Sequence, residues 1–438
     1  MPADRALAAG RAVPAGEARV APWMPWAVWA LAASLYCYGF FQRVAPSVMV
    51  DELMRDFAVG AAITGTLSSL YFYAYASLQI PVGLMVDAFG PRRVLAVSAA
   101  IAAVGSALFA AADSLALAYV GRALIGAGAG FAWVATLTVA AAWFPPNRFA
   151  MISGLTLAMG MGGAIFGQAP LALVIDAAGW RWTLAGAAVL AAMLGVLVWL
   201  VVRDRPVAAR AERASDADGA VRRGLLSGLR HALANRQTYV VSLFGAAMSA
   251  PMLAFGALWG VPYLIQRFDI DRPEAALVAS AMMIGWAVGA PLGGWLSDRL
   301  GRRRLPSIAA AAVALASLTA ALYLPGLPLA AVVPLLMVNG VAAGTMVLSF
   351  AVVREVNPPW AAGAAMGVAN MAVMASGAVF QPLVGWLLDR AWDGTTVQGT
   401  RVYGKAAFDA ALWPLPLAAV VALTAALMIR ETRCRPIA

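Results

Sequence analysis

Charged side chains, histidines and cysteines are scarce in this sequence. Only 12% of its 438 residues are charged and 63% are apolar, whereas a soluble domain is about a quarter charged and about half apolar. A single water-soluble core is therefore excluded. One histidine, His231, and two cysteines, Cys37 and Cys434, are too few for a metal site, and no Cys/His or Ser/His cluster falls at a predicted membrane face. We expect no enzymatic activity, no metal site and no cofactor.

The phosphate-binding pattern G-x-x-x-x-G-K-[ST] is also missing, which argues against a nucleotide-driven pump. What the sequence does have is a series of apolar runs of 20 or more residues, each long enough for a helix to cross a bilayer. Strands of a membrane barrel would instead alternate in polarity over about 10 residues. The sequence predicts an all-α membrane protein whose twelve transmembrane helices lie near residues 26–50, 60–86, 93–112, 115–143, 149–175, 182–202, 237–265, 274–297, 305–324, 328–353, 361–388 and 409–430.

Polar segments divide these helices into two groups of six. We predict a flexible tail over 1–25, a first bundle over 26–202, a basic linker over 203–236, a second bundle over 237–430 and a tail over 431–438. The net charge of +10 is concentrated in such connections. Basic connections beside a membrane set topology and attract anionic lipid, so we expect membrane lipid and no nucleic acid as a partner.

The basic residues also predict an orientation. With the N-terminus inside, 22 of the 31 Lys and Arg residues fall on the cytoplasmic side and 7 on the other. Because positive charge marks cytoplasmic loops, both termini are predicted to be cytoplasmic. All of these residues except Lys405 are arginine, a bias that hints at a GC-rich bacterial genome and therefore at the inner membrane of a bacterium. We expect a monomer.

The two bundles repeat each other. GLMVDAFGPRR, starting at Gly83, recurs as GWLSDRLGRRR, starting at Gly294, with an offset of 211. A second register, with an offset of 213, pairs Pro145-Pro146 with Pro358-Pro359, Gly154 with Gly367, Gln168 with Gln381 and Asp176 with Asp389. Two six-helix units in parallel topology place a binding site between them, near the middle of the membrane.

The repeated pattern G-x-x-x-D-x-x-G-x-R-R resembles the signature of the major facilitator superfamily, and Arg122 and Gly126 in the fourth helix resemble the second motif of that superfamily. The resemblance covers essentially the whole chain and implies an alternating-access carrier for a small solute. The residues that it implicates in conformational change are Gly83, Asp87, Gly90, Arg92, Arg93, Arg122, Gly126, Gly294, Asp298, Arg299, Gly301, Arg302 and Arg303.

The chemistry of the doubled motif favours a latch between helices. Gly83 and Gly294 lack side chains, so two helices can approach closely there. Asp87 and Asp298 lie at helix ends, where a carboxylate can face the N-terminus of a neighbouring helix. A contact made in one state and broken in the other biases the equilibrium. The alternative is that the arginines are only topology anchors, and the first copy lacks basic residues that the second has.

Arg43 is the main candidate for binding a solute. A charge inside a membrane span costs about 2.5–3.5 kcal/mol on insertion scales, so such a residue is a functional candidate. Its guanidinium offers a planar fork to a carboxylate or phosphate. The alternative is a side chain that reaches the outer headgroups. The full set of expected solute-binding residues is Arg43, Tyr36, Tyr71, Tyr75, Gln79, Trp259, Tyr263 and Asn370, and the alternative for the others is helix packing.

A narrower resemblance concerns the solute. An arginine in helix 1 and a tyrosine in helix 2 twelve residues before the motif aspartate, here Arg43 and Tyr75, are similar to the organophosphate and organic-anion branches of the superfamily. Sugar-phosphate antiporters carry a lysine where Gln79 stands, and their second arginine has no counterpart in helix 7. FFQRVAPSV and GTTVQGTRVYGKAAF also resemble bacterial relatives of lysosomal dipeptide carriers.

We therefore predict a secondary or facilitative transporter of a small organic anion of the carboxylate type. The alternatives are a carrier of dipeptides, sugar acids or sugar phosphates, or a transporter-like membrane sensor without net flux. A coupling ion or counter-anion is a possible further partner. The middle of the predicted spans has no Asp, Glu or His, which favours uniport or anion exchange over proton symport.

Overall fold

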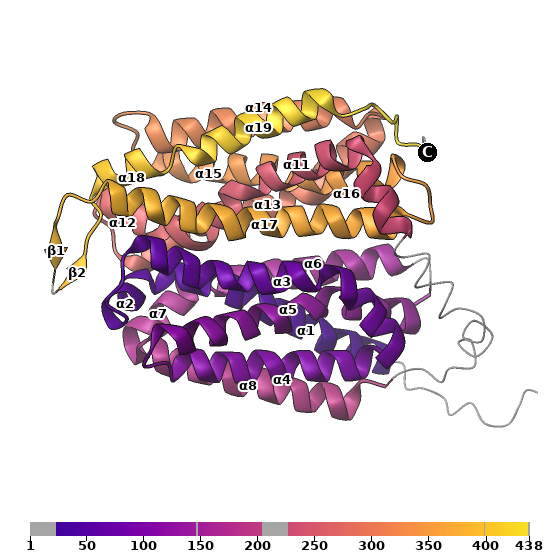
Figure 1. Ribbon diagram of the computed structural model, residues 1–438, viewed down its shortest axis with the longest axis horizontal. Helices are drawn as coiled ribbons and strands as arrows, with labels where there is room; N and C mark the ends of the chain where they lie inside the picture. Colours follow the sequence, from indigo (N-terminus) through magenta and orange to yellow (C-terminus); the bar gives the residue numbers. More distant parts are fainter. Residues whose placement is uncertain (1–22, 146–147, 204–226, 398, 437–438) are drawn as a thin grey trace, which may run out of the picture.

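The computed structural model describes residues 23–145, 148–203, 227–397 and 399–436, which are almost entirely helical. Figure 1 shows the helices running side by side in two groups, one from each half of the chain. The first half contains α1 (Met24–Val44), α2 (Val50–Asp56), α3 (Ala61–Phe89), α4 (Pro91–Ala110), α5 (Leu115–Trp143), α6 (Phe149–Phe166), α7 (Ala169–Ala178) and α8 (Trp180–Val201).

The second half has the same order of long helices with more interruptions. It contains α11 (Arg236–Pro251), the π-helical segment Met252–Trp259, α12 (Gly260–Phe268), α13 (Arg272–Leu300), α14 (Arg304–Tyr323), α15 (Leu329–Gly344), α16 (Leu348–Glu355), α17 (Ala362–Arg390), the strands β1 (Thr396–Val397) and β2 (Thr400–Arg401), α18 (Lys405–Ala411) and α19 (Pro414–Met428). The two strands pair antiparallel as a short hairpin.

Ten helices in the described part of the chain are long and apolar enough to cross a membrane, and two bent helix pairs bring the number to twelve if each pair is one span. Helices suit this environment because each satisfies its own backbone hydrogen bonds, which hydrocarbon cannot do. The structure therefore confirms the predicted all-α membrane fold.

Several boundaries differ from the predictions. The first helix was expected over 26–50, but α1 ends at Val44 and a 3₁₀ turn containing Pro46 follows, because proline lacks the N–H that a helix needs. The fifth span breaks between Phe166 and Ala169. Most of the predicted linker and the N-terminal tail up to residue 22 lie outside the described residues, while residues 227–234 of that linker are helical.

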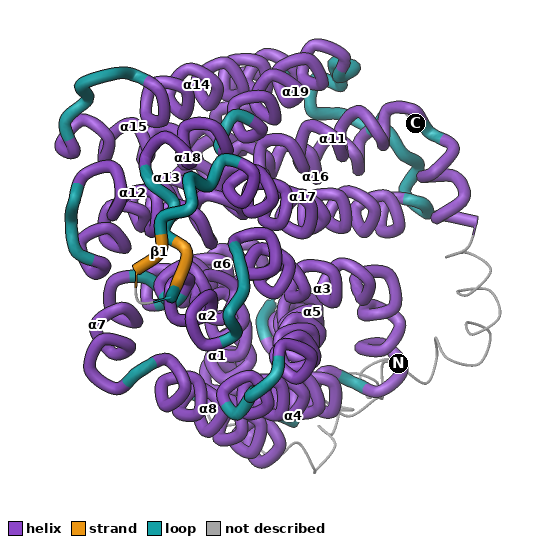
Figure 2. The backbone as a smooth tube through the Cα atoms, turned by 60° about the vertical axis from the view of Figure 1, so that its left-hand side comes forward, coloured by secondary structure: helices purple, strands orange, loops and turns teal. Residues whose placement is uncertain are grey.

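The bundle has two distinct ends. One carries the β1–β2 hairpin and is called the hairpin end; the other, where α1 begins and the chain leaves α19, is called the termini end (Figure 1). Figure 2 looks toward the hairpin end and shows the hairpin at the boundary between the halves. Strand β2 of the second half contacts α2 of the first, so the hairpin bridges the halves.

The halves meet along α3 and α17, and glycines show how closely. A Cβ built on Gly65 would lie 2.5 Å from the Gln381 carbonyl oxygen, and one on Gly385 would lie 2.3 Å from that of Ala61. Toward the termini end, a Cβ on Gly83 or Gly367 would meet no described atom within 4 Å. These two helices therefore touch near the hairpin end and separate toward the termini end.

The expected close approach at the motif glycines is not made in this structure. Neither Gly83 nor Gly294 would bring a Cβ within 4 Å of a described atom. The reason is the separation of the halves at the termini end, where both residues lie near the ends of α3 and α13. Close approach instead occurs within the first half, where a Cβ on Gly126 would lie 2.2 Å from the Tyr71 carbonyl oxygen.

Candidate functional site

Arg43 lies in the last turn of α1 and is only 4% exposed. Its guanidinium carbon lies 4.1 Å from the centre of the Phe40 ring, and the rings of Tyr75, Tyr71 and Phe72 follow at 5.5, 5.6 and 6.0 Å. Aromatic faces attract a cation, but they do not replace an anion. Among the described residues, no carboxylate forms an ion pair with Arg43, and its Nε has no hydrogen-bond partner.

The predicted tyrosines gather around this arginine. Tyr71 and Tyr75 are neighbours on α3, with ring centres 6.1 Å apart. Tyr36 packs against Phe40, the ring beneath Arg43, with ring centres 4.9 Å apart. The Tyr71 hydroxyl donates to the Gly39 carbonyl at 2.9 Å, so it ties α3 to α1. Tyr71 therefore holds the aromatic wall in place as well as lining it.

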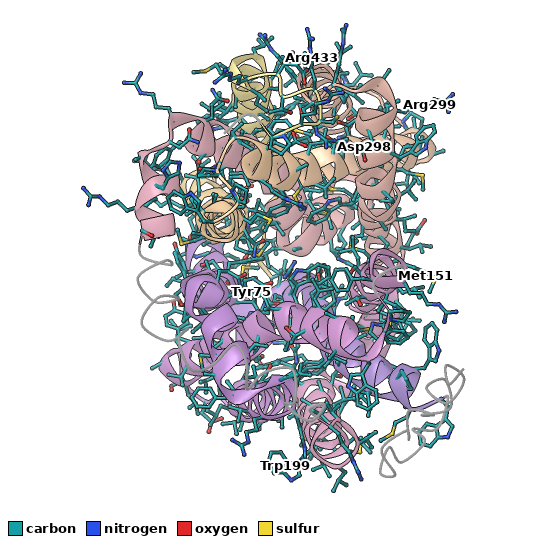
Figure 3. All side chains as sticks on the ribbon, turned by 90° about the vertical axis from the view of Figure 1, so that its right-hand side faces the viewer. Tyr75, Met151, Trp199, Asp298, Arg299 and Arg433 are labelled. Atoms are coloured by element: carbon teal, nitrogen blue, oxygen red, sulfur yellow. The ribbon has the colours of Figure 1, made fainter. Side chains whose placement is uncertain are left out.

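Gln79 and Asn370 meet across the boundary between the halves. The Asn370 side-chain amide of α17 donates to Gln79 Oε1 of α3 at 2.6 Å. The Gln79 amide in turn donates to the Tyr75 carbonyl at 3.3 Å. Figure 3, seen from the termini end, shows Tyr75 where the two halves face each other. Two residues predicted separately thus form one polar contact beside Tyr75.

Arg122 is fully buried in α5 and donates hydrogen bonds to the backbone of α1. It donates to the carbonyl oxygens of Gln42 at 2.7 Å and Arg43 at 3.4 Å. Carbonyls at the end of a helix lack partners in the helix itself, and Arg122 supplies donors there. This contact fixes the turn of α1 that carries Arg43.

Trp259 and Tyr263 are engaged elsewhere in the second half. The Trp259 indole donates to the Gln381 carbonyl at 2.9 Å, and the Tyr263 hydroxyl donates to the Leu322 carbonyl at 3.0 Å. Trp259 also lines a pocket of about 200 Å³ at the hairpin end, together with residues of both halves such as Asp51 and Tyr403. These two aromatic residues therefore brace the second half.

The first copy of the repeated motif turns at Gly90, whose φ of 80° is a conformation that glycine adopts readily. Arg92 donates through Nε and Nη2 to the Trp199 carbonyl at 2.9 and 2.6 Å, and Arg93 is exposed. The side chain of Asp87 lies outside the described part of the structure. The arginines of this copy are thus placed at the ends of α4 and α8.

The second copy forms an ion-pair cluster. Arg303 is 7% exposed and binds Glu355 and Asp298, each at 2.7 Å. Gly301 turns the chain with a φ of 61°. Arg299 lies over the Trp295 ring at 5.4 Å, and Arg302 is exposed. Among the described residues, the ion-pair partner of Asp298 is Arg303 of its own half, and no ion pair joins this aspartate to the first half.

Contacts at the hairpin end that join the halves were not predicted from the sequence. Arg272, at the start of α13, pairs with Glu52 of α2 at 2.5 Å and with Asp176 of α7 at 3.2 Å. Asp389, at the end of α17, accepts hydrogen bonds from the Ala61 and Ala62 backbone N–H groups at 3.1 and 2.9 Å.

These contacts follow the internal repeat. Asp176 and Asp389 are repeat equivalents, and each contacts the first turn of a helix in the opposite half. Asp389 accepts from backbone N–H groups of α3, whereas Asp176 pairs with the Arg272 guanidinium of α13. At the start of α3, the Asp389 carboxylate satisfies N–H groups that have no partner in the helix and interacts favourably with the helix dipole. The offset of 213 between the two aspartates was therefore the signal that could have predicted a pair of clamps. We call the Arg272–Glu52–Asp176 and Asp389–α3 contacts the hairpin-end clamps.

Metal ligands do not cluster anywhere in the described part of the chain: no group of three His, Cys, Asp or Glu side chains is placed to hold an ion. The chemistry available around Arg43 is that of one buried cation, tyrosine rings and amides. That arrangement has the groups needed to bind an anion.

Relatives with known names transport small organic anions. The chain is 26% identical over 277 residues to the probable sulfoacetate transporter SauU of Cupriavidus necator, a match that covers 61% of this chain and 64% of that protein. It is 27% identical over 383 residues to the gentisate transporter of Corynebacterium glutamicum, with 85% and 83% covered. The chain thus spans slightly less than two thirds of SauU.

Solved structures share the fold. A bacterial homologue of the human lysosomal transporter Spinster, in an inward-facing and unoccupied conformation, superposes with a TM-score of 0.71 at 16% identity, covering 94% of this chain and 95% of that one. The family model described as Major Facilitator Superfamily matches residues 31–380 and 252–433. The chain belongs to the major facilitator superfamily and is an integral membrane protein.

Proposed function

We propose that this protein carries a small organic anion of the carboxylate type across the membrane by alternating access, and that Arg43 binds the anionic group. The observation that carries the proposal is the buried guanidinium of Arg43, which has aromatic neighbours and no carboxylate partner. An isolated buried charge is costly unless it is paired, and a solute carboxylate supplies that pair through two parallel hydrogen bonds.

The size of the charge that the site accepts follows from its neighbours. Gln79 and Asn370 are neutral, and Arg122 directs its donors to backbone carbonyls of α1. Among the described residues around Tyr75, Arg43 is the cation whose guanidinium is not directed to backbone carbonyls, so a monocarboxylate is favoured over a phosphate dianion. Stacked tyrosines beside the guanidinium suit a planar or partly apolar body. The named relatives, which transport sulfoacetate and gentisate, support a carboxylate-bearing solute.

The same proposal includes a location and an orientation. We place the protein as a monomer in the cytoplasmic membrane of a bacterium. The excess of arginine at the termini end supports an orientation with both termini inside. In that orientation the halves are closed toward the outside and separated toward the cytoplasm.

Solute binding to purified protein tests the role of Arg43. A carboxylate library, including monocarboxylates, dicarboxylates, sugar acids and dipeptides, would be screened by uptake into liposomes and by thermal shift. Losing one member of a buried, hydrogen-bonded charge pair costs about 2–5 kcal/mol, or roughly 30-fold or more in affinity. R43A should lose that affinity, and R43K should recover only part of it because it lacks the fork.

The matched control is R354A, which removes an exposed arginine at the end of α16. It should bind the solute as the wild type does. Unchanged affinity in a correctly inserted R43A protein would contradict the proposed site. Binding without any flux into liposomes would instead support the alternative of a transporter-like sensor.

A further inference from the structure

A second polar site lies at the termini end of the second half, remote from Arg43. It is a hollow of about 380 Å³ between the start of α14 and the segment that follows α19. Its walls are formed by Gly301, Arg302, Arg304, Leu305, Ile308, Glu431 and Arg433. Figure 3 shows Arg433 at the outer edge of the second half, on the face seen from the termini end.

The chain after α19 is held against the helices by Glu431 and Thr432. The Glu431 carboxylate accepts from the backbone N–H groups of Arg303 at 2.8 Å, Arg304 at 3.0 Å and Arg433 at 3.0 Å. Thr432 donates to Glu355 at 2.5 Å. The hollow therefore has a fixed wall.

Charge in the hollow is unbalanced. Burial alone would raise the pKa of Glu431, but hydrogen bonds from the backbone N–H groups of Arg303, Arg433 and Arg304 outweigh burial and lower that pKa. This carboxylate is therefore ionised, and its oxygens accept hydrogen bonds from the backbone. Among the described residues, no ion pair joins Arg302, Arg304 or Arg433 to a carboxylate. Arg304 does donate to the Leu427 carbonyl at 2.6 Å. Three guanidinium groups thus line the hollow together with one carboxylate, that of Glu431, which is already hydrogen-bonded to backbone N–H groups.

The hollow also has an apolar side. Leu305, which is 49% exposed, and Ile308 belong to its lining. Close by, Leu427 and Met428 end α19 with 50% and 60% of their surface exposed. In a membrane protein such surfaces face hydrocarbon, so the hollow presents arginines at the headgroup level and aliphatic side chains next to them. Free phosphate would use only the first of these features.

We propose that this hollow binds the headgroup of an anionic phospholipid, with Arg302, Arg304 and Arg433 contacting phosphodiester oxygens and the acyl chains lying along Leu305 and Ile308. The contacts would stabilise the α13–α14 turn, where Arg303 pairs with Asp298 and Glu355. This site is independent of the proposed solute and of Arg43.

Lipid titration of the purified full-length protein in neutral detergent tests the site. Phosphatidylglycerol, cardiolipin and phosphatidylcholine would be added in turn, with bound lipid counted by native mass spectrometry. The two anionic lipids should bind the wild type at least about tenfold more tightly than phosphatidylcholine, since each arginine near a membrane surface contributes about 1 kcal/mol to anionic-lipid binding. The double variant R302Q/R433Q should lose this preference.

The matched control is R354Q/R435Q, which removes two exposed arginines of the same half that do not line the hollow. It should keep the lipid preference. Equal binding of phosphatidylglycerol and phosphatidylcholine by the wild type would overturn the proposal, even if the double variant failed to fold. Full displacement of the lipid by equimolar inorganic phosphate would also overturn it, because the site would then recognise a soluble anion.

Discussion

Gln79 is the side chain that we expect to set the charge of the solute. It stands beside Tyr75 and accepts a hydrogen bond from Asn370. Gln79→Lys would add a second cation to the site and lose that acceptor, at a cost of about 1 kcal/mol. The preference between a dianionic and a monoanionic solute should shift toward the dianion by about tenfold, or 1.4 kcal/mol, as measured by competition binding.

The control for this change is Gln266→Lys, at an exposed position at the hairpin end. It adds the same charge without approaching Arg43 and should leave the preference unchanged. A Gln79→Lys protein that binds both classes of solute as the wild type does would show that Gln79 is a packing residue.

The residue types proposed for this site could be read from the sequence, but the contacts between them could not. Arg43 could be proposed from the sequence because a charge in an apolar run is costly and therefore a functional candidate. Tyr71 and Tyr75 could be proposed because a spacing of four residues puts them on one face of a helix. Phe40 and Phe72, which also surround the guanidinium, looked like ordinary apolar residues of a span. The contact between Gln79 and Asn370 joins residues 291 positions apart, and no local pattern encodes such a pairing.

Helix ends, rather than helix middles, carry most of the polar contacts between the halves. The hairpin-end clamps contact the first turns of α3 and α13, while Asp298 at the termini end pairs with Arg303 of its own half in the described part of the chain. Such contacts can exist in one conformation and break in the other, and their loss biases the equilibrium by their differential free energy. We therefore expect the contacts at the hairpin end to stabilise the inward-open state and the contacts at the termini end to stabilise the outward-open state.

Asp389→Asn and Arg272→Gln should both shift the protein toward the outward-open state. Each removes the charge from a partly buried contact between halves, worth about 1–3 kcal/mol, so the outward-open population should rise roughly 5-fold or more. Cysteines introduced on the Tyr75 face of α3 would report the change through labelling from the outside, in a background with Cys37 and Cys434 replaced by alanine.

Asp298→Asn is the matched comparison, since it neutralises a carboxylate of the motif at the other end. It should not increase labelling from the outside, although it should change the transport rate. Identical labelling of the wild type and the two hairpin-end variants would count against the clamps as determinants of the conformation.

The two halves of the molecule share the order of their long helices, as the internal repeat predicts, but differ in where those helices are interrupted. Spans could be predicted because hydrocarbon demands long apolar helices, and the doubled motif predicted two equivalent halves. Interruptions were harder: no local pattern indicated the π-helical segment over Met252–Trp259, whereas Gly167 and Pro170 mark the break after Phe166. Both repeat-related glutamines, Gln168 and Gln381, donate to carbonyls of that π-helical segment, at 3.0 and 2.8 Å.

Energy coupling is the property that depends on the whole arrangement. A proton symporter usually needs a titratable group that exchanges its proton inside the membrane. Here the acidic residues near Arg43 along the chain, Asp51 and Glu52, lie in α2 beyond the 3₁₀ turn, and Glu52 is paired with Arg272 at the hairpin end. Asp176 and Asp389 belong to the same end, and Asp298 to the other. We therefore predict uniport or anion exchange.

Liposomes that contain a pH dye measure this directly. With a substrate gradient and no proton gradient, uptake should proceed without a change in internal pH, and it should respond either to membrane potential, as expected for uniport of an anion, or to a trapped counter-anion, as expected for exchange. Asp51→Asn should behave like the wild type, whereas Glu52→Gln should alter only the rate because it weakens the contact with Arg272. Substrate-dependent acidification that disappears in either variant would show that α2 carries the coupling proton and that the transporter is a symporter.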